Sequence, residues 1–271
     1  AGIVNGDWVT TVSPAYAREI QTPEGGFGFD GILRSRAANL SGILNGVDYS
    51  EWSPEVDPHI AAHYSADDLE GKRACKLDLL REFNLPADNP DRPLIGIVSR
   101  FAVQKGFDLV AGVAQFFAEE DVQLVILGSG DWKYEQIFND WQRWLPDKVG
   151  VWMGYNNKLA HKIEAGADMF LMPSLYEPCG LNQIYSLRYG AVPIVRATGG
   201  LEDTIQEDTG FKFRDYSVGA LYDTLRTAVG SYRNRGPWRE RMRRGMQKDF
   251  SWNASARQYT GLYRMLRGAA D

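Results

Sequence analysis

Five short runs of continuously apolar residues, separated by segments with helical periodicity, constrain the fold of this chain more than any other feature. The runs lie at residues 94–99, 122–128, 149–154, 169–174 and 192–197. Their length is typical of β-strands, and their lack of polar alternation indicates strands buried on both faces. Helical patterns fill the spaces between them, at residues 106–119, 131–144, 158–165 and 181–189. The alternation predicts an α/β fold: a doubly wound, Rossmann-like parallel sheet with helices on both faces.

Shorter elements precede and follow the sheet. Residues 8–12 favour a strand, and residues 13–20 favour a helix because they open with a serine followed by a proline. Residues 22–31 are rich in glycine and predict a flexible surface loop. We expect an amphipathic helix over residues 65–83 and further helices over residues 217–271.

The composition excludes several classes of function. The chain has 271 residues, enough for one large domain or two modest ones, and its net charge of −5 disfavours nucleic acid and anionic membranes as partners. No apolar run reaches the length of a membrane span, and we expect no signal peptide. Cys75 and Cys179 are far apart, which indicates a reducing compartment, and none of the three histidines has metal-ligand spacing. We therefore expect no metal cofactor.

A basic cluster in the C-terminal helices has two interpretations. Its members are Arg233, Arg235, Arg239, Arg241, Arg243, Arg244 and Lys248. A solvated helix face that offsets acidic surface elsewhere is favoured. Nucleic-acid binding is disfavoured because too few aromatic residues interleave the cations to stack on bases.

Two cations follow the first strand of the predicted sheet. Arg100 ends that strand, and Lys105 with Gly106 opens the next helix. A lysine in the first turn of a helix opposes the helix dipole at a cost of ~0.3–1 kcal/mol. Two cations at one strand end therefore indicate a bound anion between them. The alternative is that both are surface cations that pair with nearby carboxylates by chance.

Two loops follow neighbouring strands of the sheet, at residues 177–180 and 198–200. Ligands of open parallel sheets bind outside the carboxyl ends of the strands, where both loops lie. The helix that begins after Gly180 presents unpaired N–H groups that suit a phosphate, and Gly190 ends it. The alternative is that Glu177 only favours a helix start and that Gly180 only eases a tight turn.

The run EPCGLNQIYSLRYGAVPIVRATGGLEDT, residues 177–204, resembles the signature region of the glycogen and starch synthases. These are ADP-glucose-using, retaining glycosyltransferases of the GT-B fold. GILNGVD at residues 42–48 is similar to the segment where that family's chain enters its C-terminal domain. The resemblance implies that residues 1–42 are a remnant of the N-terminal domain, residues 43–250 the nucleotide-sugar-binding domain, and residues 251–271 a terminal helix that packs on the other domain.

The resemblance also implies roles for individual residues. Arg100 and Lys105 match the family's cations, which hold the diphosphate and stabilise its charge as it leaves. Glu177 matches the acidic residue that contacts the donor glucose. Tyr155 matches the tyrosine that stacks on adenine; the alternative is that it is an ordinary exposed tyrosine in a loop. The second glutamate of the broader retaining pattern is Tyr185 here, as in the synthases. The remaining nucleotide-sugar-binding residues implied by the resemblance are Cys179, Gly180, Leu181, Thr198, Gly199 and Gly200.

The resemblance implies transfer of glucose from ADP-glucose to the non-reducing end of an α-1,4-glucan with retention, without a metal, in a bacterial cytoplasm or a plastid. The family's catalytic histidine and its N-terminal domain have no match here, so we expect the chain to be the donor-binding half and inactive alone. Its first residue, Ala1, fits a fragment whose partners are ADP-glucose or ADP, the glucan and the missing domain. Two alternatives stay open: a retaining GT-B transferase that uses a UDP-sugar, and a non-catalytic glucan-binding module, suggested by eight Trp and thirteen Tyr.

Overall fold

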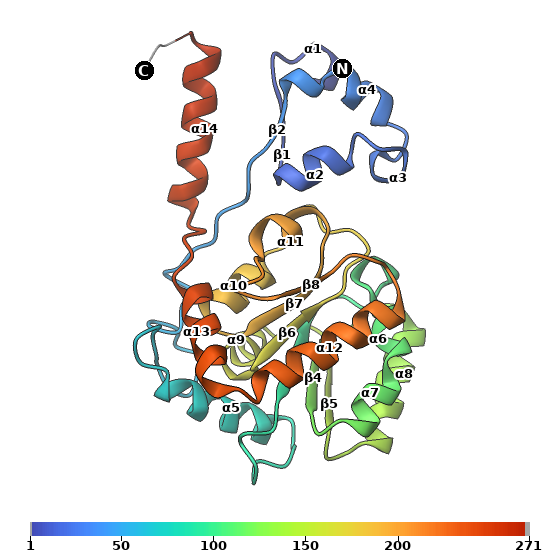
Figure 1. The fold of residues 1–271 in the computed structure, drawn as a ribbon, viewed down its shortest axis with the longest axis vertical. Coiled ribbons are helices and arrows are strands. Elements are labelled where there is room, and N and C mark those ends of the chain that lie inside the picture. Colours follow the sequence, from blue (N-terminus) through green and yellow to red (C-terminus); the bar gives the residue numbers. More distant parts are fainter. Residues whose placement is uncertain (1, 269–271) are drawn as a thin grey trace.

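A six-stranded, all-parallel sheet forms the centre of the computed structural model, which describes residues 2–268 (Figure 1). The strands are arranged in the order β5-β4-β3-β6-β7-β8. Their bounds are β3 Leu94–Val98, β4 Gln123–Gly128, β5 Val149–Met153, β6 Met169–Met172, β7 Val192–Arg196 and β8 Phe211–Phe213. The five strands expected from the apolar runs are all present, and the parallel sheet is confirmed.

The sixth strand, β8, was not predicted, so the expectation of five strands was wrong. β8 has three residues and pairs in parallel with β7, where Phe211 lies opposite Ile194. A lysine interrupts its two phenylalanines, so the sequence contains no apolar run that signals a strand. The neighbouring strand, rather than local propensity, fixes this segment in the sheet.

Helices cover both faces of the sheet, as a doubly wound fold requires. Ile95 and Ile97 of β3 point to one core, and Leu94 points to the other. The first face is covered by α6 Phe107–Gly112, α7 Ala114–Glu119, α8 Trp132–Trp144 and α12 Val218–Tyr232. The second is covered by α5 Glu70–Glu82, α9 Asn157–Gly166, α10 Asn182–Arg188 and α11 Gly199–Thr204. The helix expected over residues 106–119 is divided into α6 and α7 at Val113.

The order of the strands reverses between β3 and β6. From β3 the chain adds β4 and β5 on one side, then returns to add β6, β7 and β8 on the other. Connections that leave in opposite directions from neighbouring parallel strands open a crevice at their carboxyl ends. The topology therefore places one crevice between the residues that follow β3 and those that follow β6.

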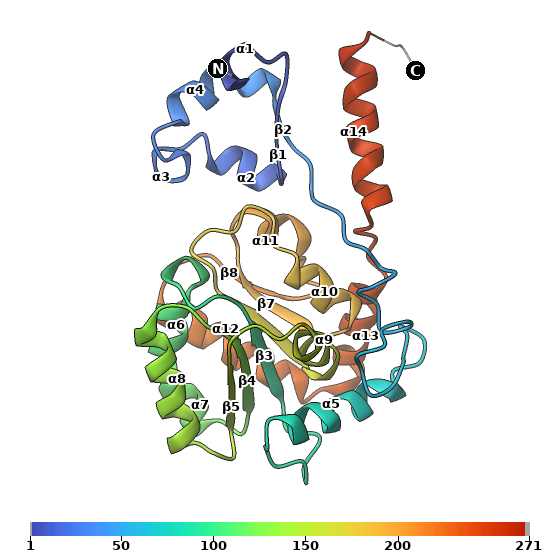
Figure 2. The same cartoon turned by 180° about the vertical axis from the view of Figure 1, so that it is seen from behind.

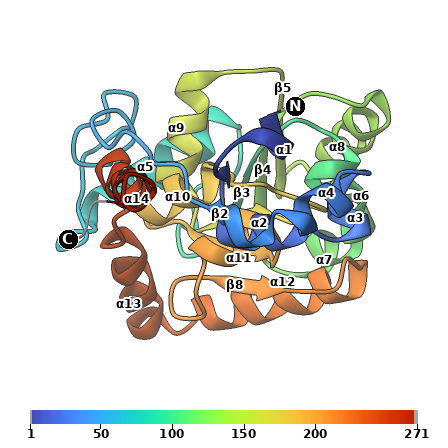
Figure 3. The same ribbon diagram turned by 90° about the horizontal axis from the view of Figure 1, so that it is seen from above.

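Residues 2–42 form a small separate layer over the carboxyl ends of the strands (Figures 1 and 3). Strand β1, Val9–Thr11, pairs in parallel with β2, Leu40–Gly42. The other elements of this segment are α1 Gly2–Asn5, α2 Pro14–Glu19, α3 Pro23–Gly26, α4 Asp30–Ser35 and the 3-10 helix η1 Ala37–Asn39. Ser13 caps α2 by accepting a hydrogen bond from the Tyr16 N–H, as its sequence predicts.

The glycine-rich stretch at residues 22–31 was predicted as a loop, and that prediction was wrong. It contains the short helix α3 and the start of α4. Thr22 caps α3 by accepting from the Gly25 N–H at 3.1 Å. A Cβ on Gly25 would lie only 2.3 Å from the Glu19 carbonyl oxygen, so the glycine permits close packing on the end of α2.

The C-terminal helices confirm the helical tail, apart from residues 269–271, which lie outside the described residues. Helix α13, Arg235–Met246, packs on the sheet, whereas α14, Trp252–Leu266, extends away from it on the same side as residues 2–42 (Figures 1 and 2). Only Ser255 of α14 is buried. Trp252 and Tyr263 are 54% and 61% exposed. The proposed packing of this helix on a further domain stays a prediction.

A buried carboxylate holds the segment that connects β2 to α5. Asp57 bonds with the His161 Nδ1 on α9 at 2.7 Å, and it also accepts from the Tyr189 hydroxyl. Burial raises the pKa of Asp57, but the hydrogen bonds from His161 and Tyr189 outweigh it, and the pKa lies below its usual value. Trp52, from the same segment, stacks on His161 with 3.6 Å between ring centroids.

We predict that Asp57→Ala lowers the free energy of unfolding by about 3 kcal/mol, because two buried donors lose their acceptor at ~1–3 kcal/mol each. The pKa of Asp57 is lower in the folded state than in the unfolded state. Its contribution to the free energy of unfolding is therefore present above the unfolded pKa of about 4 and is lost as the pH falls through the folded pKa. Urea unfolding at pH 7 and at pH 3 measures both effects. Asp67→Ala, at an exposed position, is the control, and an equal loss in both variants would contradict this account.

Candidate functional site

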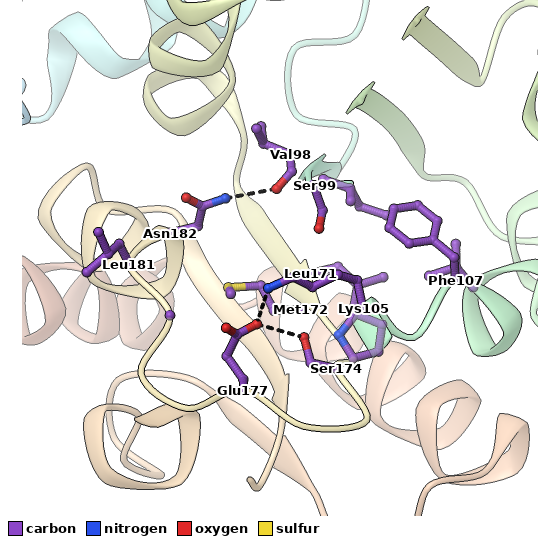
Figure 4. Close-up of a pocket in the computed structure, with 14 residues that line it drawn as sticks. Val98, Ser99, Lys105, Phe107, Leu171, Met172, Ser174, Glu177, Leu181 and Asn182 are labelled. Atoms are coloured by element: carbon purple, nitrogen blue, oxygen red, sulfur yellow. Dashed lines mark hydrogen bonds and ion pairs between the residues drawn. The ribbon is translucent and has the colours of Figure 1, made fainter. Parts of the chain in front are cut away.

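A cavity of about 160 Å³ occupies the crevice between β3 and β6. Its walls are the ends of these two strands, the turn after β6 and the start of α10 (Figure 4). The polar side chains that reach it are Ser99, Lys105, Ser174, Glu177 and Asn182. The fold therefore gathers polar groups from two connections, the one after β3 and the one after β6, at the point where the strand order reverses.

Lys105 and Glu177 form an ion pair in this cavity, with 2.6 Å between Nζ and Oε2 (Figure 4). Ser174 donates its hydroxyl to the same Oε2 at 3.2 Å. The carboxylate is nearly buried, with 7% of its side chain exposed, whereas the lysine side chain is 24% exposed. A buried carboxylate needs such partners, because burying an unpaired charge is costly.

The turn that carries Lys105 is held by a glycine. Lys105 ends the 3-10 helix η2, Val103–Lys105, and Gly106 follows it with φ +77°. A Cβ on Gly106 would lie 2.1 Å from the Pro173 carbonyl oxygen, in the turn after β6. Both the left-handed conformation and the close approach require glycine here. Gly106 thus brings the loop after β3 against the loop after β6 and places Lys105 beside Glu177.

The loop after β7 packs against the turn that carries Glu177. Gly200 donates its N–H to the Glu177 carbonyl oxygen at 3.0 Å. A Cβ on Gly199 would lie 2.0 Å from that oxygen, and one on Gly200 would lie 2.1 Å from the Cys179 carbonyl oxygen. Residues 199–204 form helix α11, so Gly199 and Gly200 open a helix where a loop was expected. Cys179 is buried, and burial raises the pKa of its thiol.

Gly180 and Leu181 line the cavity at the start of α10, and Thr198 is buried beside α11. Asn182 was missed by the sequence reasoning, although it belongs to the same EPCGLN run. Its side-chain amide donates to the Val98 carbonyl oxygen at 2.8 Å, which joins α10 to the end of β3. In the sequence, only its position directly after the turn at residues 177–180 indicated that Asn182 could lie in the site.

The structure does not bring Arg100 or Tyr155 into this cavity. Arg100 is exposed and donates to the Gln104 side chain at 3.1 Å. Tyr155 follows the edge strand β5, is 87% exposed and bonds with the Asn157 side chain. The anion between Arg100 and Lys105, and the adenine against Tyr155, stay predictions.

A second, larger groove of about 860 Å³ lies between α5 and α13. Its charged lining residues are Lys72, Arg73, Lys76, Arg235, Arg239, Arg243, Asp67, Asp68, Glu70, Asp91 and Asp168. Basic and acidic side chains are nearly equal in number here, so the groove does not favour a ligand of either charge. The smaller cavity is the one that matches the topology and the candidate residues.

Neither a metal-ligand cluster nor a membrane-spanning helix is found among the described residues. Within residues 2–268, no three histidine, cysteine or acidic side chains come together in a way that could hold a metal ion. None of the helices in this range combines the length and apolarity needed to cross a bilayer.

Residues 81–248 match the family described as Glycosyl transferases group 1. The chain belongs to this family. Residues 1–35 match a second family, described as Starch synthase catalytic domain. Neither match covers residues 36–80, which include η1, β2 and most of α5.

The transferase is homologous to bacterial glycogen synthases. It is 56% identical to glycogen synthase of Koribacter versatilis (strain Ellin345) over 96% of this chain and 55% of that protein. It is 53% identical to glycogen synthase of Anaeromyxobacter sp. (strain Fw109-5), over 98% of this chain and 57% of the relative. The chain thus spans a little over half the length of these relatives.

The fold matches that of a solved structure, the catalytic domain of Starch Synthase IV from Arabidopsis thaliana bound to ADP and acarbose. The TM-score is 0.91 at 35% identity, over 97% of this chain and 56% of the other. The six-stranded sheet of the transferase is the C-terminal domain of a GT-B fold. The expectation drawn from the resemblance in residues 177–204 is confirmed for the family and for the fold.

We predict that Gly106→Ala destabilises the transferase by ~1–3 kcal/mol, because its Cβ meets Pro173 and its φ is strained. Gly230→Ala is the matched control. Gly230 lies in α12 with open space around it, so alanine there should stabilise by ~0.4–1 kcal/mol. Thermal unfolding of both variants measures the difference. Effects of the same sign would show that the close approach to Pro173 does not constrain position 106.

Proposed function

We propose that this chain is the donor-binding half of a glycogen synthase, which transfers glucose from ADP-glucose to the non-reducing end of an α-1,4-glucan with retention. The Lys105–Glu177 pair at the strand-order reversal carries this proposal. It places one cation and one nearly buried carboxylate in a cavity where open parallel sheets bind their ligands. The homology to bacterial glycogen synthases supports the choice of reaction.

Lys105 acts on the diphosphate. When the bond from the anomeric carbon to the phosphate oxygen breaks, negative charge develops on the departing ADP. A cation placed beforehand stabilises that charge more in the transition state than in the ground state. The Lys105 ammonium has three donors and uses one on Glu177, so it can contact a phosphate without releasing the carboxylate. Arg100, two residues beyond β3, adds a second phosphate contact by rearranging its exposed side chain.

Glu177 acts on the sugar. Its carboxylate accepts hydrogen bonds from glucose hydroxyls and supports the positive charge that develops on the ring as the leaving group departs. Burial makes this electrostatic effect stronger than it would be in water. Gly180 and Leu181 line the same cavity. In this proposal their N–H groups complete the phosphate contacts, and Tyr155 stacks on the adenine from the end of β5.

The nucleotide base of the donor distinguishes this proposal from the alternative of a transferase that uses a UDP-sugar. ADP is favoured because the Arabidopsis starch synthase, which is 35% identical to this chain, was solved with ADP and acarbose. A non-catalytic glucan-binding module would not need a buried carboxylate paired with a lysine at the donor position. The chain supplies one wall of a two-domain cleft, so we expect it to bind ADP without transferring glucose by itself.

We predict that Lys105→Ala or Arg100→Ala weakens ADP binding to this chain by ~1–3 kcal/mol, the cost of one charge-assisted contact. Calorimetric titration with ADP and with UDP gives both affinities. Lys248→Ala, an exposed lysine after α13, is the control and should leave ADP affinity unchanged. Tighter binding of UDP than of ADP would contradict this proposal and would indicate that the donor is a UDP-sugar.

We predict that Glu177→Gln in the longer parent protein lowers kcat by at least about a hundredfold, with a change in KM for ADP-glucose of only a few-fold. The carboxylate acts on charge that exists in the transition state, so its loss should leave ground-state binding largely intact. Transfer of labelled glucose to glycogen is the assay, with the exposed Glu207→Gln as control. A raised KM with unchanged kcat would reassign Glu177 to donor binding alone.

A further inference from the structure

Helices α2 and α11 lie side by side and antiparallel, and each receives a carboxylate from the other. Glu19, the last residue of α2, accepts from the Gly199 N–H at 2.7 Å and from the Thr198 hydroxyl at 3.0 Å. Asp203, near the end of α11, accepts from the Ala15 N–H in the first turn of α2 at 2.7 Å. We call these five residues the α2–α11 contact. Its partners lie about 180 residues apart in the sequence.

This contact replaces a local cap. Thr198 is the N-cap residue of α11, yet its side chain makes no capping hydrogen bond to the helix. Its hydroxyl donates to Glu19 instead. A threonine at this position is able to cap the helix without help. The start of α11 therefore depends on a distant carboxylate for a contact that its own sequence could have supplied.

The α2–α11 contact joins the two parts of the chain that match different families. Glu19 lies in residues 1–35, which match the starch synthase catalytic domain. Thr198, Gly199 and Asp203 lie in residues 81–248, which match the group 1 glycosyl transferases. Figures 1 and 3 show α2 directly over α11. The contact thus crosses from the first small layer to the domain that carries the cavity.

Gly199 and Gly200 contact the backbone of Glu177 directly, so a shift of Gly199 would also shift Glu177. Gly200, the next residue, donates to the Glu177 carbonyl oxygen, and Gly199 packs on that same oxygen too closely for any Cβ. The Glu177 side chain then pairs with Lys105. Glu19, Gly199 and Glu177 form a continuous path of direct contacts from the first layer to the cavity.

We propose that Glu19 is a positioning residue for the transfer reaction. It fixes the start of α11, which fixes the backbone of Glu177, when the first layer lies on the donor-binding domain. This inference rests on the proposed function, since it assigns Glu19 to the same site. Glu19 touches neither the cavity nor the ion pair, so its effect is on geometry. A catalytic group misplaced by about 1 Å can lose on the order of a hundredfold in rate.

The test compares Glu19→Ala, Glu19→Gln and Glu24→Ala in the longer parent protein. Glu24 lies in α3 of the same layer with an exposed side chain, so it is a matched control. We expect Glu19→Ala to lower kcat by about ten- to a hundredfold with little change in KM for ADP-glucose. Glu19→Gln should recover most of this loss, because its amide oxygen can still accept from Gly199 and Thr198.

A second measurement separates this inference from the proposed function. Hydrogen exchange of the backbone amides at residues 174–182 does not depend on which donor is used. We expect faster exchange there in Glu19→Ala than in the wild type or Glu24→Ala, with the β3 and β4 amides unchanged. An unchanged exchange rate at residues 174–182, or a kcat within twofold of wild type, would overturn the positioning role. A wild-type longer parent protein that transfers no glucose from ADP-glucose would overturn the proposed function instead.

Discussion

The ion pair between Lys105 and Glu177 is the interaction on which the rest of the site depends. It joins the loop after β3 to the loop after β6 across the point where the strand order reverses. A carboxylate with 7% of its side chain exposed is unfavourable unless it is paired, and here Lys105 and Ser174 supply the partners. The pair therefore stabilises the turn at Glu177, and under the proposed function its two opposite charges act on the phosphate and on the developing positive ring of the donor.

Close packing of backbones, rather than side chains, sets the positions of these charges. Gly106 approaches Pro173, Gly199 approaches the Glu177 carbonyl, and Gly200 approaches the Cys179 carbonyl, each at a distance that excludes a Cβ. Three loops from three different strands thus come together with no side chain between them. Such packing leaves little freedom for the backbone of Glu177, and electrostatic stabilisation works best when charges do not need to reorganise during the reaction.

Local patterns were enough to predict most of the sheet and much of the cavity. The runs that became β3 to β7 are continuously apolar, so length and composition alone identified them. β8 and α3 were missed because a three-residue strand and a four-residue helix depend on neighbours more than on their own sequence. Lys105 and Glu177 were predicted separately, but their pairing was not, because sequence spacing does not report contacts between residues 72 positions apart. Glu19 had no local signal at all, since its partners lie in α11.

The two ends of the chain present different kinds of surface. The first layer meets α11 through hydrogen bonds and carboxylates, whereas α14 presents mainly exposed apolar side chains, such as Trp252 and Tyr263. Polar contacts at a partly solvated surface exchange readily with water, so they can form and break at little net cost. Buried apolar surface is more costly to separate. The polar α2–α11 contact therefore suits surfaces that separate, whereas the exposed apolar side chains of α14 suit a surface that stays covered. If Glu19 is the positioning residue proposed above, the order of the Glu177 backbone depends on the contact that can separate.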